Sequence, residues 1–154
     1  MLGPGCGNEV SRANYGEDIF SMNASTPTAR RPASEQAPAA DAAVLSKAVV
    51  RVARLLELTQ RDVAAALGIS EATTSRLFAG KYLLAPDRAK EWELARLLVR
   101  MFRSLDALWG HEDIAREWLA SNNLALAARP KDLLRSVEGM VRVVTYLDAA
   151  RGRL

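Results

Sequence analysis

Cysteine, histidine and aromatic residues are scarce in this chain. Its 154 residues include one cysteine, Cys6, one histidine, His111, and 6% aromatic residues. A single cysteine forms neither a disulfide framework nor a thiolate metal site within the chain, and a single histidine completes neither an HExxH zinc motif nor a Ser/His/acid triad. Gly3, Gly5 and Gly7 neither follow a predicted strand nor open a predicted helix, which excludes a dinucleotide-binding loop. We therefore expect a protein that is not an enzyme and has no metal or cofactor.

Long apolar runs are also absent. No stretch approaches the roughly 18 apolar residues that a membrane helix needs, and the N-terminus lacks the basic-then-apolar layout of a secretory signal. We therefore expect a cytoplasmic protein without membrane contact. The chain has 21 Lys and Arg residues against 18 Asp and Glu residues, for a formal net charge of +3. This modest excess permits nucleic-acid binding without requiring it.

Residues 1–40 are rich in glycine, proline, serine and asparagine and show no sustained apolar period. This composition is typical of a tail or leader, either flexible or ordered by a partner. Met22 opens the Ser/Thr/Pro-rich part of this segment. A start at Met1 and a start at Met22 are therefore two open alternatives for residues 1–21.

A helical apolar period begins at Ala42, and no alternating apolar and polar run predicts a strand. The spacing i, i+3, i+4, i+7 and i+11 places on one helix face Leu45, Ala48, Val49, Val52 and Leu56. Further helices are expected over 60–67, over 71–79, from Pro86 to near Gly110, over 112–120, and from near Pro130 and near Val137. The fold class is therefore predicted to be all-α.

Capping residues mark the second and third predicted helices. Thr59 and Asp62 have the spacing of a capping box, in which hydroxyl and carboxylate satisfy each other's backbone amides. Gly68 provides a left-handed turn, Ser70 is a favourable N-cap, and Gly80 ends the third helix. These two short helices and their turn are typical of a helix-turn-helix.

Two apolar stripes run along the long predicted helix and indicate that it is buried on two sides. They consist of Trp92, Ala95, Val99 and Phe102, and of Leu94, Leu98, Met101 and Leu105. Trp109 and Trp118 also lie on apolar helix faces, so all three tryptophans are expected in the core rather than in a binding platform. The last helix is expected to place Val141, Val144 and Leu147 on one side.

Residues 60–78 read QRDVAAALGISEATTSRLF and have apolar or small residues where two crossing helices must touch. These residues are Val63, Ala64, Leu67, Ile69 and Leu77. The alternative is a helical hairpin that only packs. If the second helix instead enters a major groove, its outward side chains meet base edges or phosphates. The expected DNA-binding residues are Gln60, Arg61, Ser70, Glu71, Ala72, Thr73, Ser75, Arg76 and Lys81.

The chemistry of these residues suits DNA. Arg76 can donate two hydrogen bonds to guanine and Glu71 can accept from cytosine, although an acid in the first turn also suits the helix dipole. Gln60 and Lys81 are placed for phosphates. Residues 58–82 nevertheless carry a net charge of only +1. Specific binding is therefore expected to need a dimer that reads two half-sites.

The run Leu67, Gly68, Ile69 and Ser70, followed by the pair Gly80 and Lys81, resembles the Xre/Cro family of bacterial helix-turn-helix regulators. The resemblance implies a Cro/Xre-like DNA-binding and dimerisation region over residues 41–108. One departure is Thr74, where the family has a buried valine or isoleucine, so we expect a recognition helix that is slightly less firmly seated.

A second pattern, of Trp-Leu, Asn, Pro, Leu-Leu and a Gly followed by spaced apolar residues, occupies residues 109–154. It consists of Trp118, Leu119, Asn123, Leu126, Pro130, Leu133, Leu134, Gly139, Val143 and Leu147. This part resembles the toxin-binding C-terminal domain of the MbcA, ParS and Xre antitoxins. Ala127 and Ala128 replace the glycines of the family, so the loop is expected to be stiffer. The resemblance implies an antitoxin of a type II toxin–antitoxin system that represses its own operon and blocks a partner toxin, most often an NAD-degrading toxin of the RES type.

The C-terminal end is cationic with an apolar last residue, which suits an anionic nucleotide pocket. From the residues alone, a solvated basic helix end is the alternative, and the resemblance favours contact with the toxin. The expected toxin-binding residues are Asn123, Arg142, Tyr146, Arg151, Arg153 and Leu154. The expected partners are a RES-like toxin, operator double-stranded DNA and a second copy of the chain within a toxin–antitoxin hetero-oligomer.

Two other functions stay open. One is a plain helix-turn-helix transcriptional regulator whose C-terminal half dimerises or senses a ligand. The other is a protein-interaction module whose helix-turn-helix has lost DNA binding.

Overall fold

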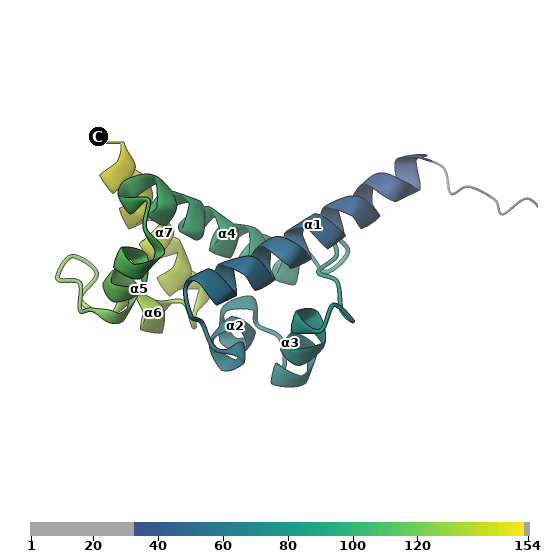
Figure 1. The fold of residues 1–154 in the computed structure, drawn as a ribbon, viewed down its shortest axis with the longest axis horizontal. Helices are drawn as coiled ribbons and strands as arrows, with labels where there is room; N and C mark the ends of the chain where they lie inside the picture. Colours follow the sequence, from purple (N-terminus) through teal and green to yellow (C-terminus); the bar gives the residue numbers. More distant parts are fainter. Residues whose placement is uncertain (1–32, 153–154) are drawn as a thin grey trace, which may run out of the picture. The chain divides into compact units, whose positions relative to one another are not determined.

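The computed structural model describes residues 33–152, with side chains from Ala39 onward. The described residues belong to one compact unit. Most of the expected tail, including Cys6 and Met22, lies outside the described residues. The helices, labelled in Figure 1, are α1 (Ala33–Leu55), α2 (Gln60–Leu67), α3 (Glu71–Phe78), α4 (Ala89–Trp109), α5 (Glu112–Ala120), α6 (Pro130–Leu133) and α7 (Val137–Arg151).

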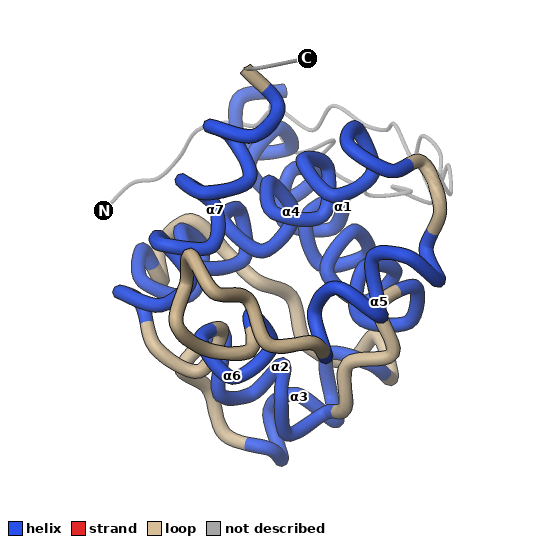
Figure 2. The backbone as a smooth tube through the Cα atoms, turned by 90° about the vertical axis from the view of Figure 1, so that its left-hand side faces the viewer, coloured by secondary structure: helices blue, strands red, loops and turns tan. Residues whose placement is uncertain are grey.

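The all-α prediction is confirmed. The described residues contain no strand, as Figure 2 shows, and their one β-bridge is an isolated antiparallel pair between Asn123 and Ala128. The predicted bounds of α2 and α5 agree with the structure, and α6 and α7 begin at the residues expected. Local capping and turn signals therefore located most helix ends correctly.

Two helix starts differ from the expectation. α1 begins at Ala33, whereas the apolar period begins only at Ala42, because an alanine-rich segment has high helix propensity without needing an apolar face. α4 begins at Ala89 rather than Pro86. Pro86 instead lies in a turn that is closed by a 3.0 Å hydrogen bond from the Arg88 amide to the Ala85 carbonyl, since the fixed φ of proline suits the second position of a turn.

A cluster of polar side chains joins the segment before α4 to that helix. The Tyr82 hydroxyl donates to Glu91 Oε2 at 2.6 Å, and Arg88 Nη1 donates to the Tyr82 hydroxyl at 2.7 Å. The Arg88 guanidinium also lies 4.7 Å from the centre of the Tyr82 ring. Burial and the neighbouring Glu91 carboxylate raise the pKa of Tyr82, against the opposing effect of Arg88.

α4 is the central helix of the core, and it packs chiefly against α7 and α1. Figure 1 shows α2 and α3 together on one side of α1. The buried side chains on α4 follow the predicted second stripe, and Ala95 of the first stripe is also buried. The core includes Val49, Val52, Ala53 and Leu56 of α1, Leu94, Ala95, Leu98, Met101 and Leu105 of α4, and Met140, Val143, Val144 and Leu147 of α7.

The three residues that the sequence places on one side of α7 differ in burial. Val144 and Leu147 are buried, whereas Val141 is 45% exposed. The period of the helix instead turns Met140 and Val143 inward, and Val141 lies one position away from this stripe.

The aromatic residues are half-buried rather than fully buried. Trp109 and Trp118 pack against the core with ring centres 5.5 Å apart. Trp118 also stacks on Tyr146, with centres 6.0 Å apart and planes 16° from parallel. Trp92 is half-buried on α4. The tryptophans of the C-terminal half therefore cover the edge of the core.

Candidate functional site

The helix-turn-helix is held by local caps at each of its ends. Thr59 and Asp62 form the predicted capping box, with Asp62 N–H donating to Thr59 Oγ1 at 3.1 Å and Thr59 N–H donating to Asp62 Oδ2 at 3.0 Å. Gly68 has a φ of 66° at the turn, a conformation that favours glycine. Ser70 caps α3 by accepting from the Thr73 amide at 3.1 Å. Local signals in the sequence therefore determine where α2 and α3 begin and where the turn between them lies.

Thr74 faces the interior of the helix-turn-helix. Its exposed fraction is 0%, and its hydroxyl donates to the carbonyl of Ser70 at 3.1 Å. The hydroxyl therefore replaces a methyl group of the family's valine without leaving a buried polar group unpaired.

The expected DNA-binding residues lie on the surface. Arg76 is exposed, although its side chain folds back along α3: Nε donates to the Ala72 carbonyl at 3.3 Å and Nη2 to Thr73 Oγ1 at 3.5 Å. Thr73 is half-buried. The exposed residues of the set are Gln60, Arg61, Ser70, Glu71, Ala72, Ser75, Arg76 and Lys81. Their contact with DNA stays a prediction.

Three of the expected toxin-binding residues make contacts within the chain. Asn123 Oδ1 accepts from the Leu126 amide at 3.1 Å, and Arg142 Nη2 donates to the Leu126 carbonyl at 3.0 Å. Tyr146 is the residue that stacks on Trp118. Arg142 therefore ties the loop between α5 and α6 to α7, Asn123 bonds within that loop, and Tyr146 ties α7 to α5.

The other three belong to the end of the chain. Arg151 is exposed in the last turn of α7. Arg153 and Leu154 lie outside the described residues.

The loop between α5 and α6 contains the departure noted in the sequence. Ala127 has a φ of 53°, in the left-handed region, where an alanine is strained and a glycine is not. The strain is at the position where the family pattern has a glycine.

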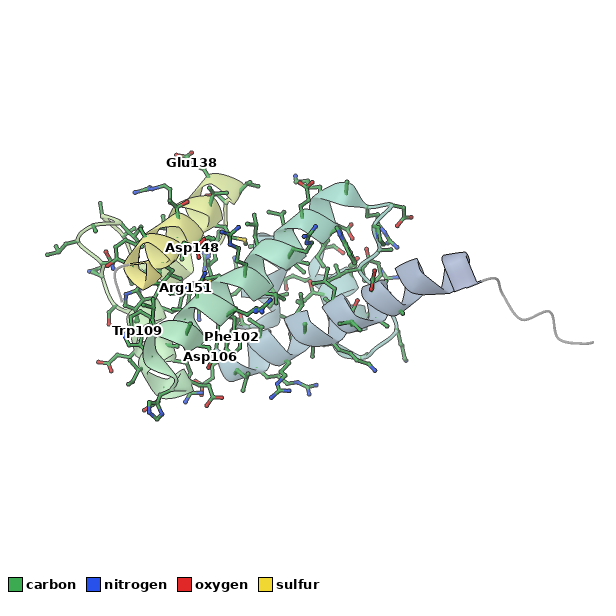
Figure 3. All side chains as sticks on the ribbon, turned by 90° about the horizontal axis from the view of Figure 1, so that it is seen from above. Phe102, Asp106, Trp109, Glu138, Asp148 and Arg151 are labelled. Atoms are coloured by element: carbon green, nitrogen blue, oxygen red, sulfur yellow. The ribbon has the colours of Figure 1, made fainter. Side chains whose placement is uncertain are left out.

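A groove of about 930 Å³ lies between α4, α7 and α1. Arg100 Nη2 lies 2.6 Å from Asp148 Oδ2, and Ser104 Oγ donates to Asp148 Oδ1 at 2.9 Å. In Figure 3, Asp148 and Arg151 lie on α7 beside α4. The groove is lined by four arginines and two acidic residues, namely Arg96, Arg100, Arg103, Arg151, Glu93 and Asp148. This surface was not predicted from the sequence, although the helical spacing of Arg96, Arg100 and Arg103 was a signal for it.

Ion pairs also connect the helix-turn-helix to the C-terminal helices. Asp62 Oδ2 lies 3.2 Å from Lys131 Nζ and its Oδ1 lies 3.6 Å from Arg135 Nη2. Burial alone raises the pKa of the Asp62 carboxyl, but the hydrogen bonds from Thr59 and Lys131 outweigh burial and hold the pKa below its ordinary value. Arg116 of α5 donates to the Leu55 carbonyl at 3.1 Å.

Exposed apolar side chains are a further feature that the sequence reasoning missed. Leu124 is 98% exposed at the loop, and Val137 and Val141 are about half exposed on α7. The i, i+4 spacing of the two valines was the available signal.

No helix in residues 33–152 is long and apolar enough to cross a membrane. In the same range, no three His, Cys, Asp or Glu residues gather in an arrangement that could hold a metal ion.

Two family models match the chain. The model of the antitoxin Xre-like helix-turn-helix domain matches residues 35–100, which include most of α1, all of α2 and α3 and most of α4. The model of the antitoxin Xre/MbcA/ParS C-terminal toxin-binding domain matches residues 104–153, which include α5 to α7. A comparison of the chain with curated proteins finds no match. The chain therefore belongs to the Xre family of antitoxins, with an Xre-like helix-turn-helix followed by an Xre/MbcA/ParS-type toxin-binding domain.

Proposed function

We propose that the chain neutralises a RES-like, NAD-degrading toxin by direct binding through its C-terminal domain, and that it represses its own operon by binding DNA. It acts by binding and carries out no catalytic step. The observation that carries the proposal is a fully capped helix-turn-helix with an exposed α3 face, in a chain whose second half matches a toxin-binding domain.

The DNA-binding part rests on α3. Its outward residues Glu71, Ser75 and Arg76 are exposed, while Thr74 and Leu77 anchor the opposite face in the core. A helix with one anchored face and one polar face can enter a major groove without losing its own packing. The small net charge of this module supports binding as a homodimer, because two modules on adjacent half-sites double the number of phosphate contacts.

The toxin-binding part rests on the end of α7. Arg151 is exposed there, and Arg153 and Leu154 follow it in the sequence. Guanidinium groups pair well with carboxylates and with the phosphates of a bound nucleotide. The proposed toxin-binding residues also include Asn123 and Arg142, which hold the α5–α6 loop, and Tyr146, which stacks on Trp118.

The test is an NAD-hydrolysis assay with the protein encoded next to this chain's gene. We expect the full chain to form a stoichiometric complex with that protein and to stop its consumption of NAD. A chain that ends at Ala149 should inhibit less well, whereas Lys90→Gln, an exposed change on α4, should inhibit normally. A full chain that binds DNA from its own upstream region but captures no protein would instead be a plain regulator.

A further inference from the structure

A row of cations lies along α1, outside the helix-turn-helix segment. Lys47, Arg51 and Arg54 occur at i, i+4 and i+7, so they share one face of the helix. All three are exposed, and among the described residues none forms an ion pair with a carboxylate. Residues 42–56 contain no Asp or Glu. We call these three residues the α1 cationic stripe.

The α1 cationic stripe lies beside the end of α3. Its three side chains line one wall of a groove of about 440 Å³, and the other wall includes Phe78, Gly80 and Tyr82 from the end of α3 and the segment after it. No acidic residue lines this groove. The exposed Lys81 follows Gly80 in the same segment.

The two ordinary explanations for surface cations account for only part of this row. A cation in the last turn of a helix offsets the helix dipole, which explains Arg54. It does not explain Lys47 and Arg51, which lie further from the helix end. A solvated polar face usually mixes both signs of charge, whereas this face of α1 has one sign only.

We propose that the α1 cationic stripe binds the phosphate backbone at the edge of the major groove that receives α3. The proposal rests on the DNA-binding part of the proposed function and extends it to a helix outside the recognition motif. From Lys47 to Arg54 the row is about 10 Å long, from the 1.5 Å rise per residue. A continuous row of one sign matches the evenly spaced charges of a DNA strand better than the scattered carboxylates of a protein surface.

The α1 cationic stripe also adds to the small net positive charge of the helix-turn-helix. Residues 58–82 have a net charge of +1, whereas residues 42–82 have a net charge of +3. In addition, Glu57 and Asp62 in the longer segment already pair with Arg116 and Lys131. Since affinity for DNA depends strongly on the number of neutralised phosphates, α1 supplies charge that α2 and α3 lack.

The test compares two double variants of the full chain. Arg51→Gln with Arg54→Gln removes two exposed charges of the stripe, and Arg96→Gln with Arg103→Gln removes two exposed charges on α4. Glutamine is a good helix former, so both variants should keep their helices. Binding is measured by fluorescence anisotropy over a range of salt concentrations, on a duplex from immediately upstream of the gene and on a scrambled duplex.

We expect the stripe variant to bind both duplexes roughly tenfold more weakly, and its plot of log Kd against log salt concentration to flatten by about two units. The preference for the upstream duplex should not change, because phosphate contacts carry no sequence information. The α4 variant should lose less than about twofold and keep the wild-type slope.

Each of the following results would overturn the proposal. Equal losses in the two variants would mean that only the overall charge matters. Normal DNA binding with weakened binding of the partner protein would assign the stripe to an acidic protein surface. A wild-type chain that binds neither duplex would overturn both this proposal and the DNA-binding part of the proposed function, whereas normal DNA binding by the stripe variant would overturn this proposal alone.

Discussion

Lys131 Nζ lies 3.2 Å from Asp62 Oδ2, and so joins α6 to the N-terminal turn of α2. The same carboxylate completes the capping box with Thr59. The first turn of α2, where Gln60 is expected to meet phosphate, is thus held by a residue from the toxin-binding domain. This ion pair is one of several contacts that join the two functional halves of the chain.

Asp62→Asn should destabilise the fold by about 1–2 kcal/mol at neutral pH, because it weakens a cap and a half-buried ion pair. The pKa of the Asp62 carboxyl is lower in the folded chain than its ordinary value of 3.8. The ionised carboxylate therefore stabilises the fold above pH 3.8, and this stabilisation is lost as the pH falls through the pKa of the folded state. The free energy of unfolding should therefore fall less steeply with acid in the variant than in the wild type.

Urea unfolding at a series of pH values measures this difference. Asp132→Asn is the control, since its pair with Arg129 is more exposed and surface pairs contribute little. Identical acid profiles for wild type and Asp62→Asn would show that this carboxylate does not stabilise the fold.

Ala127→Gly should stabilise the chain by about 0.5–1 kcal/mol. Alanine at a φ of 53° is strained, and glycine removes the strain at some cost in chain entropy. Ala128→Gly is the matched control and should destabilise, since Ala128 does not have a positive φ. Thermal unfolding of both variants gives the comparison, and equal shifts in the two would contradict the strain at Ala127.

Gly139→Ala should destabilise by about 2 kcal/mol, because overpacking of a tight site has costs of this size. A Cβ at Gly139 would overlap the Leu133 carbonyl oxygen and crowd Ser136 Oγ, which caps α7. A Cβ at Gly152 would come no closer than 3.5 Å to the Asp148 carbonyl oxygen, so Gly152→Ala should leave the midpoint of chemical unfolding unchanged. Equal midpoints for both variants would mean that α6 and α7 can separate without cost.

Thr74→Val tests how α3 is seated. Thr74 is fully buried, and its hydroxyl donates its one hydrogen bond to the Ser70 carbonyl. The Thr74 amide donates to the same carbonyl at 2.9 Å. Removing the hydroxyl therefore leaves no unpaired group, and we expect a change in the free energy of unfolding between zero and about 1 kcal/mol in the stabilising direction. A clear loss of stability in urea would show that the hydroxyl is needed.

Local signals in the sequence predicted most of the fold, and non-local contacts account for the rest. Thr59, Ser70 and Gly68 act on residues within one turn, so their roles could be predicted. The pair of Asp62 with Lys131 joins residues far apart in the chain, and no sequence pattern indicates it.

The same distinction separates the two parts of the candidate site. Exposure of Ser75 and Arg76 follows from the helical period of α3. The internal bonds of Asn123 and Arg142 depend on where the Leu126 backbone lies once the loop has folded. Single-helix periodicity grouped Val141 with Val144 and Leu147, but it could not show that Met140 and Val143 are buried while Val141 is exposed, because that depends on how α4 packs against α7.

Arg76→Ala should weaken binding to the upstream duplex by about 1–3 kcal/mol while leaving binding to a scrambled duplex nearly unchanged, since a base contact carries sequence information and a phosphate contact does not. Ser75→Ala should act in the same direction with a smaller effect. Both residues are exposed and Arg76 bonds only to groups of its own helix, so neither change should alter stability by more than about 0.5 kcal/mol. Lys81→Ala provides the contrast, because loss of a phosphate contact should weaken binding to both duplexes equally. If Arg76→Ala and Lys81→Ala gave the same pattern on the two duplexes, α3 would not be the element that reads the sequence.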